Sequence, residues 1–277
     1  MEIRRQNDLE KYPQPKPVDE IARYLNLFLF GDHGSWKTVT ACQVGAQRGR
    51  VLLLHTDDDW KSLHNHPEVK QNVDPVQMMD PYHAKLISEA FRDRVSPYDK
   101  YATIVFDTVG GWADEFIEIL LTNVQYSDRN SRSRVSGIGN KGERFVSSMN
   151  LTTPELTDYN LAKIQLRPIV NNFVKAPVNV VFIAHNRNVE ESKTKKFNNW
   201  AHIRPDLPEG CFNVLARKCD ALGHFQKQSG DRPPKISFKL TKEVTTKTRL
   251  GVFRNKELIV PDAVTLINEW LESKESE

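Results

Sequence analysis

Cysteine is scarce in this sequence, and its scarcity argues against two kinds of site. Only three cysteines occur in 277 residues, at positions 42, 211 and 219, and no two of them form a C-x-x-C pair. Such a sparse, odd set argues against a disulfide framework and against a zinc site, and it is typical of a reducing compartment. We therefore expect a cytoplasmic protein.

Long apolar runs are missing as well. No stretch reaches the roughly 18 consecutive apolar residues that a membrane-spanning helix needs, so we expect no membrane partner. The opening segment MEIRRQNDLEKYPQPKP is polar and shows no signal peptide. The net charge is only +3, which by itself does not indicate a nucleic-acid partner.

Short apolar runs are present instead, and they alternate with helical stretches after a polar arm at residues 1–22. Each run is too short for a typical helix, is rich in β-branched or bulky residues and is apolar on both faces, as buried parallel strands are. The runs occupy residues 25–30, 51–55, 102–107 and 178–185. The helical stretches occupy residues 38–47, 84–95, 112–122 and 158–174.

This alternation predicts an α/β fold in which a mainly parallel central sheet is flanked by helices. Two further strands are expected at residues 219–227 and 235–241, forming a C-terminal β-hairpin. Residues 261–273 are predicted to be a helix because Pro261 suits a helix start and the apolar residues share one face. We assign residues 23–277 to one domain.

The segment GDHGSWKT, residues 31–38, nearly matches the phosphate-binding loop G-x-x-x-x-G-K-[ST], and it lies between a predicted strand and a predicted helix as that motif requires. Backbone N–H groups and the helix N-terminus would cradle phosphates. The lysine would reach the β- and γ-phosphates of ATP, and the threonine hydroxyl would bind Mg²⁺. The residues expected to contact the nucleotide are Gly31, Asp32, His33, Gly34, Ser35, Trp36, Lys37, Thr38 and Val39.

Trp36 stands where the motif has its last glycine. The position belongs to the first helical turn, where a right-handed backbone would allow a side chain. We therefore expect the indole to point away from the nucleotide, onto the sheet or a neighbouring subunit. Trp36→Gly is then expected to preserve or improve nucleotide affinity.

Polar residues end three of the predicted strands, at the edge where ligands bind in α/β sheets. Asp107 is expected to order Mg²⁺, and Asp57 or Asp58 to position the attacking water, although the latter two could equally form a solvated acidic turn. His185 is expected to sense the γ-phosphate, with a purely structural histidine as the alternative.

Two long polar stretches, residues 123–150 and 186–204, interrupt the pattern. Their cations would bind phosphates and their aromatic rings could stack on bases, which predicts single-stranded DNA binding, whereas the alternative is a pair of solvated loops. The first stretch contributes Arg129, Arg132, Arg134, Lys141 and Arg144. The second contributes Arg187, Lys193, Lys195, Lys196 and Arg204, with Phe197 and Trp200.

The order GDHGSWKT, HTDDD, IVFD, FIAH and KTRLG resembles the RecA-like ATPases, particularly the phage-type ATPases related to the Sak group of single-strand annealing proteins. The segments RPDLPEG and LARKCDALGHF are also similar to that group, and the resemblance spans about residues 23–270. It implies ATP and Mg²⁺ at residues 31–38 with Asp107, a catalytic acid near Asp57, and single-stranded or forked DNA at the loops. A single-strand DNA-binding protein is a further expected partner. Trp36 departs from the family pattern, as does aspartate where glutamate is commoner.

The turn KTRLG, residues 247–251, is similar to the K-x-R-x-G turn of ring-forming ATPases of the DnaB helicase type. That resemblance implies that Lys247 and Arg249 reach the γ-phosphate bound by the next subunit, where an arginine stabilises the transition state. A head-to-tail contact of this kind closes into a ring, here a hexamer or heptamer, or extends as a filament. The alternative is a solvated hairpin tip.

Three other functions fit parts of the sequence. Asp57, Asp58, Asp59 and Asp107 could hold two metals in a structure-specific DNA nuclease. Trp36 could disable hydrolysis and leave a nucleotide-dependent DNA-binding scaffold. A small-molecule kinase would leave the basic loops and KTRLG without a role.

Overall fold

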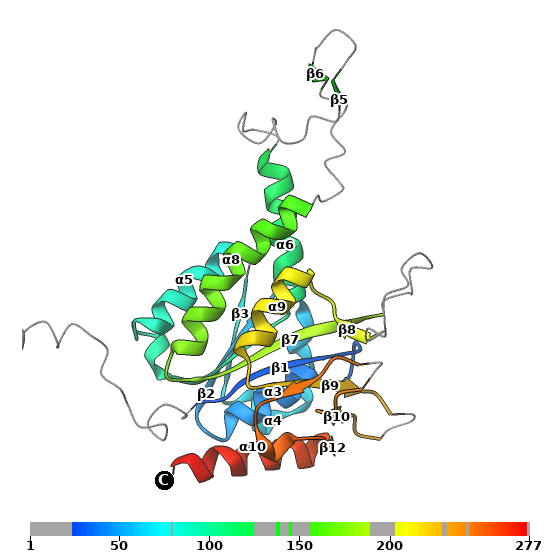
Figure 1. Cartoon of the computed structure of the whole chain (residues 1–277). Coiled ribbons are helices and arrows are strands. Elements are labelled where there is room, and N and C mark those ends of the chain that lie inside the picture. The colour runs from blue at the N-terminus through cyan, green and yellow to red at the C-terminus, as the bar shows by residue number, and fades with distance from the viewer. Residues whose placement is uncertain are drawn as a thin grey trace, which may run out of the picture.

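The computed structural model describes residues 24–78, 80–124, 137–138, 144–145, 156–188, 203–228, 232–241 and 244–275. A central sheet with the strand order β12-β10-β9-β1-β7-β4-β2-β3 organises this part of the chain (Figure 1). Its parallel strands are β1 (Asn26–Gly31), β2 (Arg50–His55), β3 (Val73–Gln77), β4 (Tyr101–Asp107), β7 (Asn179–Asn188) and β9 (Ala221–Gln226). This order brings the carboxyl ends of β1, β7, β4 and β2 side by side, which creates one continuous edge for a site.

Antiparallel strands complete the sheet. They are β8 (Ile203–Pro205) on β7, β10 (Lys235–Ser237) and β11 (Lys247–Thr248) on β9, and β12 (Glu257–Ile259) on β10. The antiparallel pair β9–β10 is the predicted C-terminal hairpin, although its second strand ends at Ser237 rather than at residue 241. A separate pair joins β5 (Gly137–Ile138) to β6 (Arg144–Phe145).

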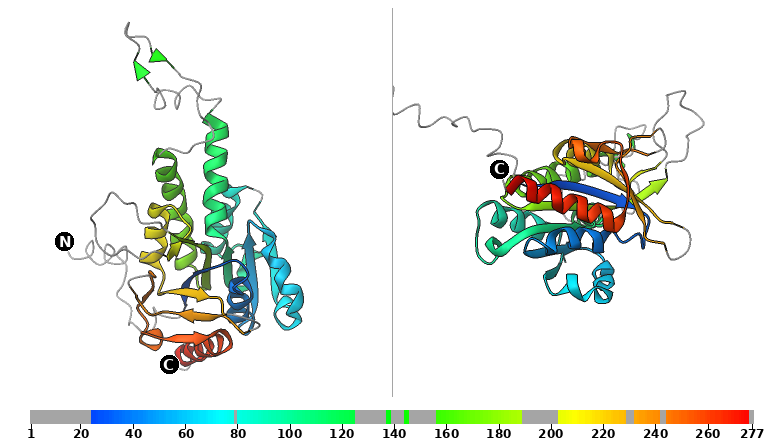
Figure 2. Two further views of the ribbon diagram at one scale, coloured as in Figure 1. Left: turned by 90° about the vertical axis from the view of Figure 1, so that its right-hand side faces the viewer. Right: turned by 90° about the horizontal axis from the view of Figure 1, so that it is seen from below.

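Helices pack on both faces of the sheet (Figures 1 and 2). The long ones are α3 (Lys37–Ala46), α5 (Pro81–Arg92), α6 (Val109–Val124), α8 (Leu156–Lys175), α9 (Glu209–Lys218) and α10 (Val260–Glu275). Short turns form α4 (Pro67–Lys70) and the 3₁₀ segments η1 (Asp58–Asn65), η2 (Tyr98–Lys100) and η4 (Gly251–Phe253). None of the helices in the described ranges is long and apolar enough to cross a membrane.

Alternation along the strands divides the core into two layers. Phe28 and Phe30 of β1 belong to the layer covered by α5, α6, α8 and α9, while Leu27 and Leu29 belong to the layer covered by α3 and α10. All four side chains are fully buried. This two-sided burial explains why the strand sequences are apolar at every position rather than at every second one.

The predicted α/β fold with its mainly parallel sheet is confirmed. The strands and helices expected from the apolar runs all form, with ends shifted by a few residues. The strand β3 was not anticipated because Pro75 lies within it, and proline is unfavourable inside a sheet. Its position at the edge of the sheet, next to β2 alone, explains why the proline is tolerated.

The packing of α3 on the sheet gives a stability test at Gly45. A Cβ atom there would lie 2.7 Å from a Val51 methyl and 2.8 Å from the Thr103 Cβ, so Gly45→Ala should overpack the interface. We expect Gly45→Ala to lower the free energy of unfolding by about 1–3 kcal/mol in urea titrations, despite the better helix propensity of alanine. Gly251→Ala is the control, because nothing lies within 4 Å of a Cβ at Gly251. Equal stability of the two variants would contradict this packing.

Candidate functional site

The predicted phosphate loop forms a tight connection between β1 and α3. It begins at Gly31, where a Cβ would lie 2.6 Å from the Phe225 backbone oxygen, so only glycine fits against β9. Gly34 has φ +68, a left-handed conformation that glycine adopts without strain. The Ser35 hydroxyl donates to the Asp32 carbonyl over 2.7 Å, which closes the loop on itself.

Lys37 lies inside this loop. Its side chain is only 5% exposed, and its ammonium group donates to the backbone carbonyls of Gly31 at 3.1 Å and Asp32 at 2.7 Å. The loop therefore surrounds the Lys37 ammonium group, which in this motif binds the phosphates. A buried ammonium group at the mouth of a phosphate loop is well suited to bind an anion.

Thr38 and Asp107 meet although they are 69 residues apart in the chain. The Thr38 hydroxyl donates to an Asp107 carboxylate oxygen at 2.5 Å, and both side chains are buried. A hydroxyl and a carboxylate are hard oxygen ligands of the kind that Mg²⁺ takes in nucleotide sites. These two residues therefore fit the predicted metal.

Trp36 has a backbone conformation that differs from the expected one. It is the N-cap of α3 with φ 66 and ψ 19, which is left-handed, so the prediction of a right-handed helical turn is wrong. The motif favours glycine here because L side chains are disfavoured in this region, at a cost of about 1–2 kcal/mol. The indole is 45% exposed, and its edge meets the His66 ring with centroids 5.9 Å apart.

Three predicted or neighbouring side chains converge beside the loop. His185 pairs with Gly31 in the register of β7 on β1, and its ring stacks on His33 with centroids 3.6 Å apart. The Nε2 atom of His185 lies 3.9 Å from an Asp57 carboxylate oxygen. The structure thus brings His185 and Asp57 together at the strand ends, as the sequence predicts. Asp58 starts η1, and its side chain lies outside the described part.

A cavity of about 380 Å³ adjoins the phosphate loop. Residues Gly34 to Val39 line one side, and Ser62, Asn65 and His66 line the other. The contribution of η1 and its neighbour His66 could not be expected from the strand-ending motifs. Only the proline after His66, which suits a helix start, marks this segment in the sequence.

The two stretches assigned to DNA lie mostly outside the described residues. This applies to Arg129, Arg132, Arg134, Lys141, Lys193, Lys195, Lys196, Phe197 and Trp200, and to the side chain of Arg144. What the structure places is their attachment: the first stretch joins α6 to α8, and the second joins β7 to β8.

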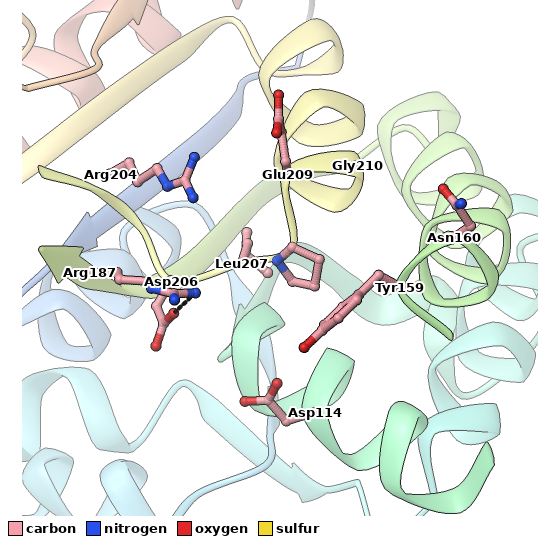
Figure 3. Close-up of a pocket in the computed structure, with 10 residues that line it drawn as sticks. Asp114, Tyr159, Asn160, Arg187, Arg204, Asp206, Leu207, Glu209 and Gly210 are labelled. Carbon is pink, nitrogen blue, oxygen red and sulfur yellow. Dashed lines mark ion pairs between the residues drawn. The ribbon is translucent and has the colours of Figure 1, made fainter. Parts of the chain in front are cut away.

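Arg187 and Arg204, which flank the second stretch, face each other across the antiparallel β7–β8 pair. Both line a cavity of about 390 Å³ shared with Asp114 of α6, Tyr159 of α8 and the start of α9 (Figure 3). Arg187 also lies 4.0 Å from Asp206. The cavity therefore combines two guanidinium groups and a phenol ring with the carboxylates of Asp114, Asp206 and Glu209.

Lys247 and Arg249 lie at the other end of the sheet. The Lys247 ammonium donates to the carbonyls of Ala216 and Cys219, and the Arg249 guanidinium donates to the Arg217 carbonyl at 2.6 Å. These carbonyls end α9, so both cations cap the negative end of that helix dipole. Burial, with Arg249 nearby, lowers the pKa of Lys247. The KTRLG segment is thus held to the body of the protein and is not a free hairpin tip.

One protein family and several solved structures are similar to this chain. The model of one protein family, AAA_24, described as an AAA domain, matches residues 23–250. No curated protein matches the chain. Similar solved structures include the RadB recombinase, at 12% identity and a TM-score of 0.42 over 77% of this chain and 79% of that one. Another is the flagellar accessory protein FlaH from Methanocaldococcus jannaschii, at 12% identity and a TM-score of 0.35 over 79% of this chain and 79% of that one. Both likenesses concern the fold alone.

The cavity of Figure 3 gives a pH-dependent prediction at Asp114. Partial burial, then the carboxylates of Asp206 and Asp57, raise the pKa of Asp114 above its ordinary value of 3.8, while Arg187 opposes the rise. A raised pKa means that ionised Asp114 destabilises the folded state once the pH exceeds that pKa. Asp114→Asn should therefore stabilise the folded state at pH 7 and raise the melting temperature. The gain in the free energy of unfolding should be less than about 1 kcal/mol because solvent screens the group.

The gain from Asp114→Asn should vanish as the pH falls below 3.8, where the carboxyl is protonated in both states. Asp93→Asn is the control of opposite sign, because Arg92 lowers the pKa of Asp93. That variant should lose stability at pH 7. Thermal melts at pH 3 and pH 7 that showed the same sign for both variants would contradict this assignment.

Proposed function

We propose, because this chain belongs to the AAA_24 family of AAA domains, that it is a Mg²⁺-dependent ATPase that acts on single-stranded or forked DNA. The observation that carries the proposal is the joint placement of Lys37, Thr38 and Asp107. One buried cation and one hydroxyl–carboxylate pair lie at the start of α3, and the N-terminus of a helix is a favourable place for an anion. This is the arrangement that phosphoryl transfer requires.

The residues of the site divide the chemistry among themselves. The Lys37 ammonium would leave its loop carbonyls for the phosphate oxygens and offset the charge that develops in the transition state. Thr38 and Asp107 would hold Mg²⁺, which when bound neutralises charge on the β- and γ-phosphates. Asp57 would orient the attacking water and accept its proton. The His33–His185 stack would register the γ-phosphate, because it joins the loop to β7.

DNA is the proposed partner of the cavity at the base of the two basic stretches. Arg187 and Arg204 supply charge for phosphates, and Tyr159 supplies a ring on which a base can stack. The Asp206 amide donates to the carbonyl of His185 at 2.8 Å, so this cavity is bonded directly to the strand end beside the phosphate loop. Such a link would let nucleotide state and DNA affinity influence each other.

The resemblance to phage-type ATPases of the Sak group supports a role in phage DNA recombination, repair or replication. A head-to-tail ring would bring Lys247 and Arg249 of one subunit to the phosphates of the next. To act there, the Lys247 ammonium and the Arg249 guanidinium would first leave the α9 carbonyls that they bind within their own chain.

ATP hydrolysis with and without single-stranded DNA tests the proposal. Lys37→Ala should reduce the rate by at least about 100-fold, because the buried cation of the loop is lost, and Asp107→Ala should do nearly as much. DNA should stimulate the unmodified protein. Lys235→Ala is the matched control, since Lys235 is an exposed lysine of β10, and it should keep the full rate.

Three outcomes would contradict the proposal. Full hydrolysis by Lys37→Ala would exclude this site. EDTA-sensitive cleavage of forked DNA without ATP would indicate the nuclease instead. ATP binding without turnover by the unmodified protein would indicate the nucleotide-dependent scaffold.

A mixing experiment tests the action of Arg249 in trans. Arg249→Ala and Lys37→Ala chains should each be inactive, while a mixture should recover part of the ATPase rate, because some interfaces join an intact loop to an intact arginine. Native mass spectrometry would establish that the oligomers are mixed. Arg217→Ala, an exposed arginine of α9 in the same region, is the control and should not need rescue. Mixed oligomers without recovered activity would refute the proposal.

A further inference from the structure

The cavity beside the phosphate loop extends beyond what a triphosphate chain needs. Its volume of about 380 Å³ lies in the range of small-molecule sites. Lys37 and Thr38, the residues assigned to phosphates and metal, line it together with Ser62, Asn65 and His66, which come from η1 and its C-terminal end.

Trp36 borders this cavity with an aromatic surface that remains accessible. The indole is 45% exposed although it touches the His66 ring. It also borders a second cavity, of about 520 Å³, that lies between α3, α4 and α10. Trp36 therefore lines both cavities, and its indole is not packed into the core.

The backbone of Trp36 is in a region that disfavours any side chain, with φ 66. Strained residues of this kind occur at ligand sites, where the side chain has a task that offsets the strain. Glycine would adopt the same φ freely, so the loop itself does not require tryptophan. The indole must then contribute something that the phosphate loop alone does not supply.

We propose that Trp36 and His66 form the nucleobase wall of the site, and that the purine of a nucleoside triphosphate packs against the indole. This inference rests on the proposed ATPase function. Lys37 and Thr38 hold the phosphates, and the indole next to them in the chain meets the purine. Asn65 offers its amide to the polar edge of the base. Aromatic stacking on a base strengthens binding by about tenfold or more.

The proposal distinguishes ATP from inorganic tripolyphosphate, which has the same phosphates and no base. Calorimetry with Mg²⁺ present should show that Trp36→Gly binds ATP roughly tenfold more weakly, while tripolyphosphate binds as well as before or better. The sequence-based expectation that glycine preserves affinity would then hold for the phosphates alone. Trp36→Phe should retain most of the affinity for ATP, because it keeps an aromatic face.

Trp36→Asn is the matched control for the backbone. Asparagine tolerates the left-handed region but offers no aromatic face, so it should behave as the glycine variant does. A second readout is fluorescence: ATP should quench the emission of the unmodified protein and of Trp270→Phe on α10, but not that of Trp36→Phe.

Each other result would overturn the inference. Equal losses for ATP and tripolyphosphate in Trp36→Gly would mean that the indole shapes the loop and does not meet the base. Unchanged ATP affinity in Trp36→Gly would remove Trp36 from the site. The proposed ATPase function would stand in that case if Lys37→Ala lost both ligands. An unmodified protein that binds neither ligand would refute the proposed function and this inference together.

Discussion

The hydrogen bond between the Thr38 hydroxyl and the Asp107 carboxylate is the contact on which the site depends. It joins the start of α3 to the end of β4 across the intervening strand β7. Such a contact is possible only in a parallel sheet whose neighbouring strands all end at the same edge. The buried apolar strands all end at that edge of the sheet. The polar residues that follow them in the chain therefore lie close together.

The phosphate loop combines two glycines in conformations that suit them with one tryptophan whose backbone is strained. Gly31 leaves room for the Phe225 backbone because it has no Cβ, and Gly34 adopts a positive φ that glycine takes freely. Trp36 adopts a similar left-handed φ without that freedom. The surrounding hydrogen bonds of Lys37 and Ser35 hold the loop closed and thereby maintain the unfavourable conformation.

Much of this arrangement could be predicted from the sequence, for a physical reason. Apolar strands, a glycine-containing loop and a strand-end aspartate are local signals, and a parallel sheet converts them into a shared site. The His33–His185 stack and the contact of Trp36 with His66 could not be predicted, because they depend on how η1 and the loop lie in space. The conformation of Trp36 was mispredicted because this residue was assigned to the first helical turn, whereas it is the left-handed N-cap that precedes α3.

The KTRLG segment and the phosphate loop lie at opposite ends of β9. Arg249 bonds to Asp220 just before that strand, while Gly31 lies level with Phe225 near its end. Five residues of strand span about 16 Å, so one subunit cannot fold its own arginine turn onto its own nucleotide. If the turn acts between subunits, an open chain of protomers always has one nucleotide site without an arginine, whereas a closed ring has none. Ring closure would then give the last nucleotide site an arginine, as every other site already has. The number of nucleotide sites that have an arginine, compared with the number of subunits, would show whether the assembly is open or closed.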